Sequence, residues 1–149
     1  MKTLAINKRA SFDYELLDHY EAGLVLLGHE VKSVKTGHLS LKGSYVTVKG
    51  NELCLTNAFI PPYPFAGKLP HYDPTRSRGL LLKKSEIRSL IGKIRVQGLT
   101  LVPLRVYTRR RLLKLEFAVG KGKKSFDKRH SIAKRDDTRR IQRTLREAG

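Results

Sequence analysis

The chain has 149 residues, of which 31 are lysine or arginine and only 13 are aspartate or glutamate, so its formal net charge is +18. Such a charge favours an anionic partner: nucleic acid, an acidic protein or an anionic membrane surface. No apolar run approaches the roughly 18 residues that span a bilayer, and the N-terminus is too short and polar for a secretory leader, so we expect a cytoplasmic protein without membrane attachment. The single cysteine and the scattered histidines predict neither a disulfide nor a metal site.

The first quarter of the chain predicts one strand and one short helix. Residues 1–10 are expected to be a loose lead-in. The apolar residues of 12–27 fit a strand and a helix almost equally, and we favour a strand because Gly23 weakens a helix. A short helix is predicted over 28–36, with Gly37 placed where a helix commonly ends.

The middle of the chain predicts a hairpin, a loop and a second helix. Residues 44–60 are typical of a hairpin whose turn is Gly50-Asn51. Five of the six prolines lie between residues 61 and 74, which indicates a long irregular loop. The second short helix is expected to begin near Ser85 and to end at Gly92.

Two further strands are predicted before residue 120. In the first, residues 99–107, Pro103 indicates an edge position or a bulge. In the second, residues 113–119, large apolar side chains alternate with smaller or charged ones, so one face should be buried. Arg109-Arg110-Arg111 should form the turn between these strands.

The composition changes at residue 120. Residues 120–149 carry eleven lysines or arginines against four acidic residues and few large apolar ones. This segment cannot bury enough surface to offset the entropy cost of ordering its backbone. We therefore predict one β-rich domain over residues 1–119, a closed or partly closed barrel with small helices, and a basic tail over 120–149 that is disordered alone and helical on a partner.

The tail is the first candidate RNA-binding element. Its glycines let the backbone approach phosphates, its cations can bind successive phosphates, and its one aromatic ring can stack on a base. The alternative interpretation is a solvated tail that only aids solubility. The candidate residues are Lys121, Lys123, Lys124, Phe126, Asp127, Lys128 and Arg129.

Charged residues in the body are the second candidate group. Arg76 and Arg78 either bind phosphates or hold the proline-rich loop in place, and the sequence does not decide between these roles. Glu21 and Glu30 either accept hydrogen bonds from RNA or pair with a nearby lysine or arginine, and pairing is favoured. Cys54 is interpreted as a small core residue rather than a nucleophile. With no nucleophile–base pair and no phosphate-binding glycine loop of the Walker type, we expect no enzyme activity.

Several short segments together resemble the SsrA-binding protein family, also called small protein B. They extend over about 130 residues in the family's order. The matching segments are Asn7-Lys8-Arg9-Ala10, Glu21-Ala22-Gly23, Glu30-Val31-Lys32-Ser33, Gly43-Ser44-Tyr45-Val46, Asp73-Pro74-Thr75-Arg76, Leu80-Leu81-Leu82, Gly120-Lys121-Gly122-Lys123-Lys124 and Asp127-Lys128-Arg129.

The resemblance implies a fold and a function. It implies an oligonucleotide-binding-type β-barrel with small flanking helices. It also implies binding to the tRNA-like domain of transfer-messenger RNA, together with elongation factor Tu, in the rescue of stalled ribosomes. The tail would enter the empty mRNA channel of the small subunit. No cofactor and no catalysis are implied, and we expect a monomer.

The resemblance also assigns residues. By position, the tRNA-like domain would be contacted by Asn7, Tyr14, Glu21, Leu81 and Lys114, to which the sequence adds Arg76 and Arg78. The small-subunit decoding region would be contacted by the tail residues given above. Two other functions remain open, a structural ribosomal protein and a general single-strand-binding barrel.

Overall fold

The computed structural model describes residues 1–123, which form a mostly β domain. The tail candidates Lys124, Phe126, Asp127, Lys128 and Arg129 lie outside the described residues. Within residues 1–123, no helix is long and apolar enough to cross a membrane. The described elements in chain order are β1 (Lys2–Ile6), α1 (Ala10–Asp13), β2 (Tyr14–Leu24), α2 (Gly28–Lys35), β3 (Tyr45–Lys49), β4 (Glu52–Thr56), β5 (Arg78–Leu81), α3 (Lys84–Gln97), β6 (Thr100–Arg109) and β7 (Leu112–Gly122).

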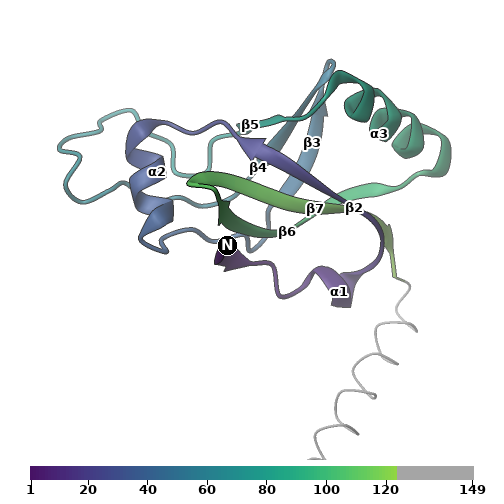
Figure 1. Ribbon diagram of the computed structural model, residues 1–149, viewed down its shortest axis with the longest axis horizontal. Helices are drawn as coiled ribbons and strands as arrows, with labels where there is room; N and C mark the ends of the chain where they lie inside the picture. Colours follow the sequence, from purple (N-terminus) through teal and green to yellow (C-terminus); the bar gives the residue numbers. More distant parts are fainter. Residues whose placement is uncertain (124–149) are drawn as a thin grey trace, which may run out of the picture.

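All seven strands belong to one antiparallel sheet in the order β1-β6-β7-β2-β5-β4-β3. The sheet curves, and α2 and α3 lie at its opposite ends (Figure 1). The edge strand β3 lies near β6. Within residues 1–123, however, β4 is the only strand with which β3 forms a hydrogen-bonded ladder, so the two edges of the sheet are not joined. The mostly β fold with small helices is therefore confirmed, whereas the sheet is open and a closed barrel is not confirmed.

The centre of the sheet is β7, which pairs with β2 on one side and β6 on the other. Its apolar side chains are buried as the alternation predicts, and Phe117 is completely covered. The register of β6 shifts between Pro103 and Arg105, which confirms the predicted bulge; β6 itself lies inside the sheet. Burying each large apolar side chain contributes about 1.5–3 kcal/mol. The most buried core side chains are Val34, Leu41, Leu53, Leu55, Ile60, Leu90, Leu101, Val106, Leu115 and Phe117.

Most of the predicted elements before residue 61 are confirmed. The ambiguous stretch is strand β2, the first helix is α2, and Cys54 is a buried residue of β4. The β3–β4 hairpin turns at the predicted position, with Gly50 at a positive φ of 62°. Glycine suits that position because it lacks the Cβ atom that disfavours left-handed backbone.

Two predictions about regular structure are wrong, and the short elements α1 and β5 were not predicted. Residues 2–6 are not a loose lead-in but strand β1, which pairs with β6. Helix α3 does not end at Gly92 but continues to Gln97, because Gly92 is exposed and Ile94 extends the apolar side of the helix. Gly98, with φ of 62°, ends the helix by donating its N–H to the Ile94 carbonyl.

The last strand continues past the predicted domain boundary at residue 119. Gly122 pairs with Tyr14, and the Lys123 N–H donates to the Asp13 carbonyl at 3.0 Å. A Cβ atom at Gly120 would lie 2.8 Å from Val102 Cγ2, so glycine permits close packing there. The first residues assigned to the tail are thus part of the sheet.

Candidate nucleic-acid interface

Three of the predicted RNA-binding residues meet around Gly23 on β2. Gly23 pairs with Leu81 of β5 on one side and with Lys114 of β7 on the other. Glu21 lies two residues earlier on the same strand, and therefore on the same face of the sheet. Because Gly23 has no side chain, the Leu81 side chain packs over it, 3.4 Å from where a Cβ atom would lie, and 65% of Leu81 is still exposed.

The Glu21 carboxylate is held in place from β6. The Tyr107 hydroxyl donates to it, and Arg109 Nη1 lies 3.2 and 3.3 Å from its two oxygens. The hydrogen bond from Tyr107 lowers the pKa of Glu21 more than burial raises it, and the Arg109 charge lowers it further. The interpretation of Glu21 as a paired carboxylate is confirmed, and one third of its side chain stays exposed. An RNA contact by Glu21 stays a prediction.

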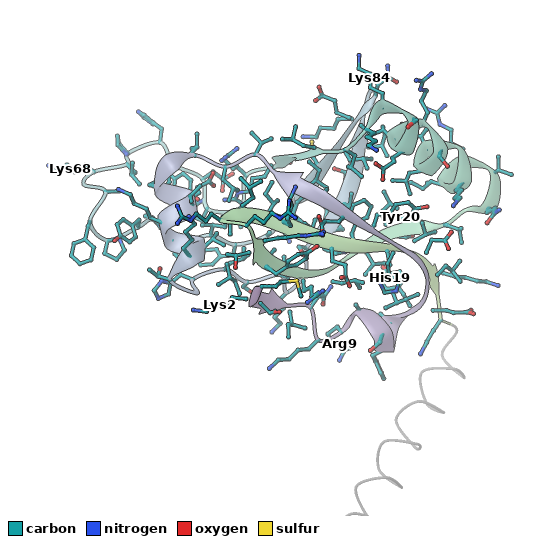
Figure 2. All side chains as sticks on the ribbon, in the orientation of Figure 1. Lys2, Arg9, His19, Tyr20, Lys68 and Lys84 are labelled. Carbon is teal, nitrogen blue, oxygen red and sulfur yellow. The ribbon has the colours of Figure 1, made fainter. Side chains whose placement is uncertain are left out.

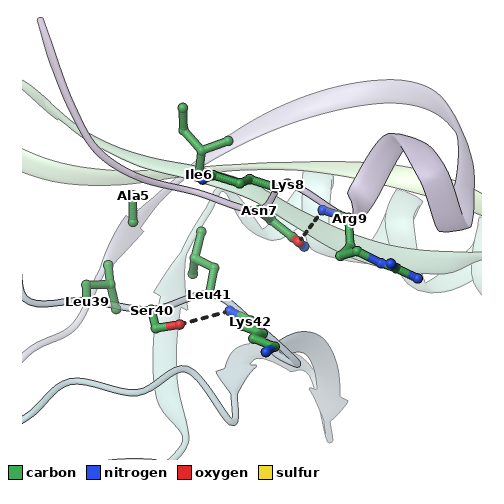
Figure 3. A pocket seen from close by; sticks show the side chains of 9 residues that line it. All are labelled: Ala5, Ile6, Asn7, Lys8, Arg9, Leu39, Ser40, Leu41 and Lys42. Atoms are coloured by element: carbon green, nitrogen blue, oxygen red, sulfur yellow. Dashed lines mark hydrogen bonds between the residues drawn. The ribbon is translucent and has the colours of Figure 1, made fainter. Parts of the chain in front are cut away.

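Asn7 and Tyr14 lie elsewhere, in a groove between α1 and the start of β3. Asn7 Nδ2 donates to the Pro103 carbonyl at 2.8 Å, and Asn7 Oδ1 accepts from the Arg9 backbone N–H at 3.3 Å. The second of these bonds, and the neighbouring groove that runs to Lys42, are visible in Figure 3. The Asn7 amide thus fixes the chain between β1 and α1. The RNA contacts of Asn7 and Tyr14 stay predictions.

Arg78 has a different role from the predicted RNA contact. Its side chain is completely buried. Nη2 lies 2.7 Å from Glu30 Oε2, and Nη1 donates to the Ala58 carbonyl at 2.6 Å. The same guanidinium donates to the Pro74 carbonyl at 2.9 Å. Arg78 therefore cannot reach RNA; instead it holds the proline-rich loop in place, the alternative role that the sequence left open.

Glu30 is the centre of this buried network. Its carboxylate also accepts from Arg76, from the Tyr72 hydroxyl at 2.9 Å and from the Leu27 N–H at 2.8 Å. Burial by itself would raise the pKa of Glu30, but these hydrogen bonds outweigh it and lower the pKa to about 2. The interpretation of Glu30 as a paired carboxylate is confirmed.

Arg76 lies at the rim of the same network. Its Nε is 3.2 Å from Glu30 Oε2, its Nη1 donates to the Ser77 carbonyl, and 30% of its side chain is exposed. The guanidinium is therefore used mainly to hold the loop to α2. Its predicted phosphate contact stays a prediction.

Comparison with known proteins places the chain in a family. A sequence model described as SmpB protein matches residues 4–147. The chain belongs to the SmpB protein family. It is 47% identical to the SsrA-binding protein of Trichodesmium erythraeum, over 98% of this chain and 94% of that protein. It is 49% identical to the SsrA-binding protein of Alkaliphilus metalliredigens, over 97% and 91% of the two chains.

A solved structure also resembles this SmpB-family chain. It comes from work on tmRNA–SmpB and its journey to the centre of the bacterial ribosome. The two chains superpose with a TM-score of 0.65 at 45% sequence identity, covering 80% of this chain and 84% of the other. The fold assignment therefore rests on sequence and structure together.

Only two of the tail candidates lie in the described part of this SmpB-family chain. Lys121 is an exposed residue of β7, paired with Glu15 in the backbone ladder. Lys123 Nζ donates to the Ser11 carbonyl at 2.9 Å, so this lysine is positioned against α1. Within residues 1–123, no three His, Cys, Asp or Glu side chains are grouped as a metal site would require.

Proposed function

We propose that this chain binds the tRNA-like domain of transfer-messenger RNA and delivers it to stalled ribosomes for trans-translation. The observation that carries the proposal is the match to the SmpB family over residues 4–147, together with relatives that bear the name SsrA-binding protein. In this function the chain acts as an RNA-binding protein, without catalysis or a cofactor. The net charge of +18 suits it to a polyanion.

The face around Gly23 is the proposed contact with the tRNA-like domain. Lys114 supplies a cation for phosphate, Glu21 an acceptor for hydroxyl or amino groups, and Leu81 an exposed apolar surface for a ribose or base. Phosphate contacts give affinity, whereas acceptors and apolar surfaces recognise the shape and the 2′-hydroxyls of RNA. The fixed geometry of Glu21 supports this assignment, because a preorganised acceptor loses little entropy on binding.

The remaining partners are proposed from the family resemblance. The basic tail, from Lys121 through Lys123, Lys124, Phe126, Asp127 and Lys128 to Arg129, contacts the small-subunit decoding region and the empty mRNA channel. Elongation factor Tu belongs to the same complex. The chain acts in the cytoplasm as a monomer.

The test is to sequence the RNA that copurifies with the tagged full-length chain. Transfer-messenger RNA should be the most abundant RNA recovered with the chain, and the recovered amount should change with the abundance of transfer-messenger RNA in the cell. A fixed ratio of the chain to ribosomes in cells lacking transfer-messenger RNA would instead identify a structural ribosomal protein. A broad mixture of single-stranded RNAs would identify a general single-strand-binding protein.

A further inference from the structure

The turn between β6 and β7 has an unfavourable backbone for its sequence. Arg109 pairs with Leu112, so the loop consists of Arg110 and Arg111 alone. Both have positive φ values, 51° and 68°. Two-residue turns with positive φ at both positions favour Asn-Gly, because most side chains are disfavoured in left-handed backbone. The β3–β4 turn of this chain uses Gly50 at its positive-φ position, whereas the β6–β7 turn uses two arginines.

The cations of this turn are exposed and mostly uncompensated. Arg109, Arg110 and Arg111 are all exposed, and Lys114 follows on β7. Arg109 donates to the Glu21 carboxylate, which also accepts a hydrogen bond from the Tyr107 hydroxyl. For Arg110 and Arg111, residues 1–123 offer neither an ion pair nor a side-chain hydrogen bond. Strained backbone that presents unpaired charge is expected where the charge has a function.

An apolar groove lies directly beside these cations. Leu112 and Leu81 line it, and their exposed fractions are 60% and 65%. Its rim carries Arg111 and Lys114, and no acidic residue is among those that line it. Apolar floor and cationic rim together complement a nucleotide, whose sugar and base are largely apolar and whose phosphates are anionic.

We propose that the β6–β7 turn extends the Gly23 face with an RNA contact that the family resemblance does not assign; the groove beside the turn shares Gly23, Leu81 and Lys114 with that face. Arg110 and Arg111 bind the phosphates of a backbone segment, and a nucleoside of that segment packs on Leu112. The inference rests on the proposed function, because it extends the Gly23 face of the interface along the same edge of the sheet. Phosphate binding by Arg110 and Arg111 would also explain why arginines occupy the two strained positions of this turn.

The test separates folding from binding by replacing the turn with its preferred sequence. Arg110→Asn/Arg111→Gly relieves the strain, so Tm should rise by about 3–6 °C. Binding to a transcript of the tRNA-like domain should nevertheless weaken, by roughly fivefold for each phosphate contact at 0.15 M salt, and the slope of log K against log salt should become shallower by about 0.7–0.9 per contact. Arg110→Lys/Arg111→Lys should restore the slope, and Leu112→Ser should weaken binding without changing it.

The matched control removes the same number of charges at a distance. Arg95 on α3 lines a hollow with Gly50 of the β3–β4 turn, and Lys49 precedes that glycine; none of the residues that line this hollow lines the groove beside Leu81. Helix α3 lies at the other end of the sheet from α2 (Figure 1). Lys49→Gln/Arg95→Gln should leave affinity within about twofold of the wild type. Equal losses of affinity in both double variants would overturn the inference and indicate an effect of total charge. Wild-type affinity of Arg110→Asn/Arg111→Gly would also overturn it, because the turn would then make no RNA contact. A wild-type chain that does not bind the transcript would contradict the proposed function itself.

Discussion

Arg78 Nη2 lies 2.7 Å from Glu30 Oε2, although the two residues are 48 positions apart in the sequence and neither side chain is exposed to solvent. The pair joins the first residue of β5 to α2 across the proline-rich loop. Buried charges of this kind contribute little net energy when complete, but removing one partner leaves an uncompensated charge in the interior. Removing either member of this buried pair should therefore destabilise the loop.

Glu30→Gln should destabilise the protein strongly, because the neutral amide leaves the Arg78 charge buried without a counter-ion. The expected loss of unfolding free energy is about 3 kcal/mol or more, measured by urea denaturation. Asp18→Asn is the control, since it removes the exposed partner of Lys93 and should cost less than about 1 kcal/mol. Equal, small losses in both variants would show that the buried pair is not a structural requirement.

The same network predicts a pH dependence of stability. The pKa of Glu30 is about 2 in the folded chain and about 4.5 ordinarily. Well above pH 4.5 the carboxylate is ionised in both states, so the network contributes fully. As the pH falls from 4.5 to 2, the unfolded chain takes up the proton first, and roughly 3 kcal/mol of stability is lost. Urea unfolding at pH 7, 4 and 3 should show about two thirds of this loss by pH 3 in the wild type, and a flatter dependence in Glu30→Gln.

Truncation should separate the body from the tail at residue 123. A chain ending at Lys123 keeps all of β7 and should retain the wild-type Tm and RNA affinity while losing tagging activity on stalled ribosomes. A chain ending at Val119 lacks the pairs of Gly120 and Gly122 with β2 and should be less stable by roughly 2–3 kcal/mol, at about 1 kcal/mol for each backbone hydrogen bond. Loss of RNA affinity in the chain ending at Lys123 would show that the tail, rather than the body, binds transfer-messenger RNA.

Elements with a strong local pattern could be predicted from the sequence, and the rest depended on distant partners. The apolar alternation of β7 and the turn at Gly50 are local signals, and both were found. The end of α3 was missed because an exposed glycine inside a helix resembles one that ends it. Strand β5 has only four residues, too few for a periodic signal, and is defined by its pairing with β2 and β4.

The candidate site shows the same division. Glu21, Leu81 and Lys114 were assigned by family resemblance, and the structure brings them together around Gly23. The burial of Arg78 could not be predicted, because an arginine next to a turn is usually exposed and its partner Glu30 lies in another element. The support that Tyr107 gives Glu21 also arises from strand order, which no local pattern reports.

The Glu21 carboxylate should contribute to affinity without contributing to counter-ion release. Glu21→Ala should weaken binding of the tRNA-like domain roughly tenfold, because a charged hydrogen-bond acceptor is lost, and the salt slope should stay unchanged. Titrations at several salt concentrations measure both quantities. Glu52→Ala removes an exposed acid at the start of β4 and should not weaken binding. Normal affinity of Glu21→Ala would leave Glu21 only the structural role of pairing with Arg109.

Exposed cations lie on several sides of the described domain, so affinity alone does not locate the interface. Examples labelled in Figure 2 are Lys2, Arg9, Lys68 and Lys84. The most direct measurement is ultraviolet cross-linking of the full-length chain to the tRNA-like domain, followed by mass spectrometry of the linked peptides. Cross-links should concentrate in the peptides that carry Glu21, Leu81 and Lys114. Cross-links concentrated on α3 instead, with none on the strands beside Gly23, would contradict the account.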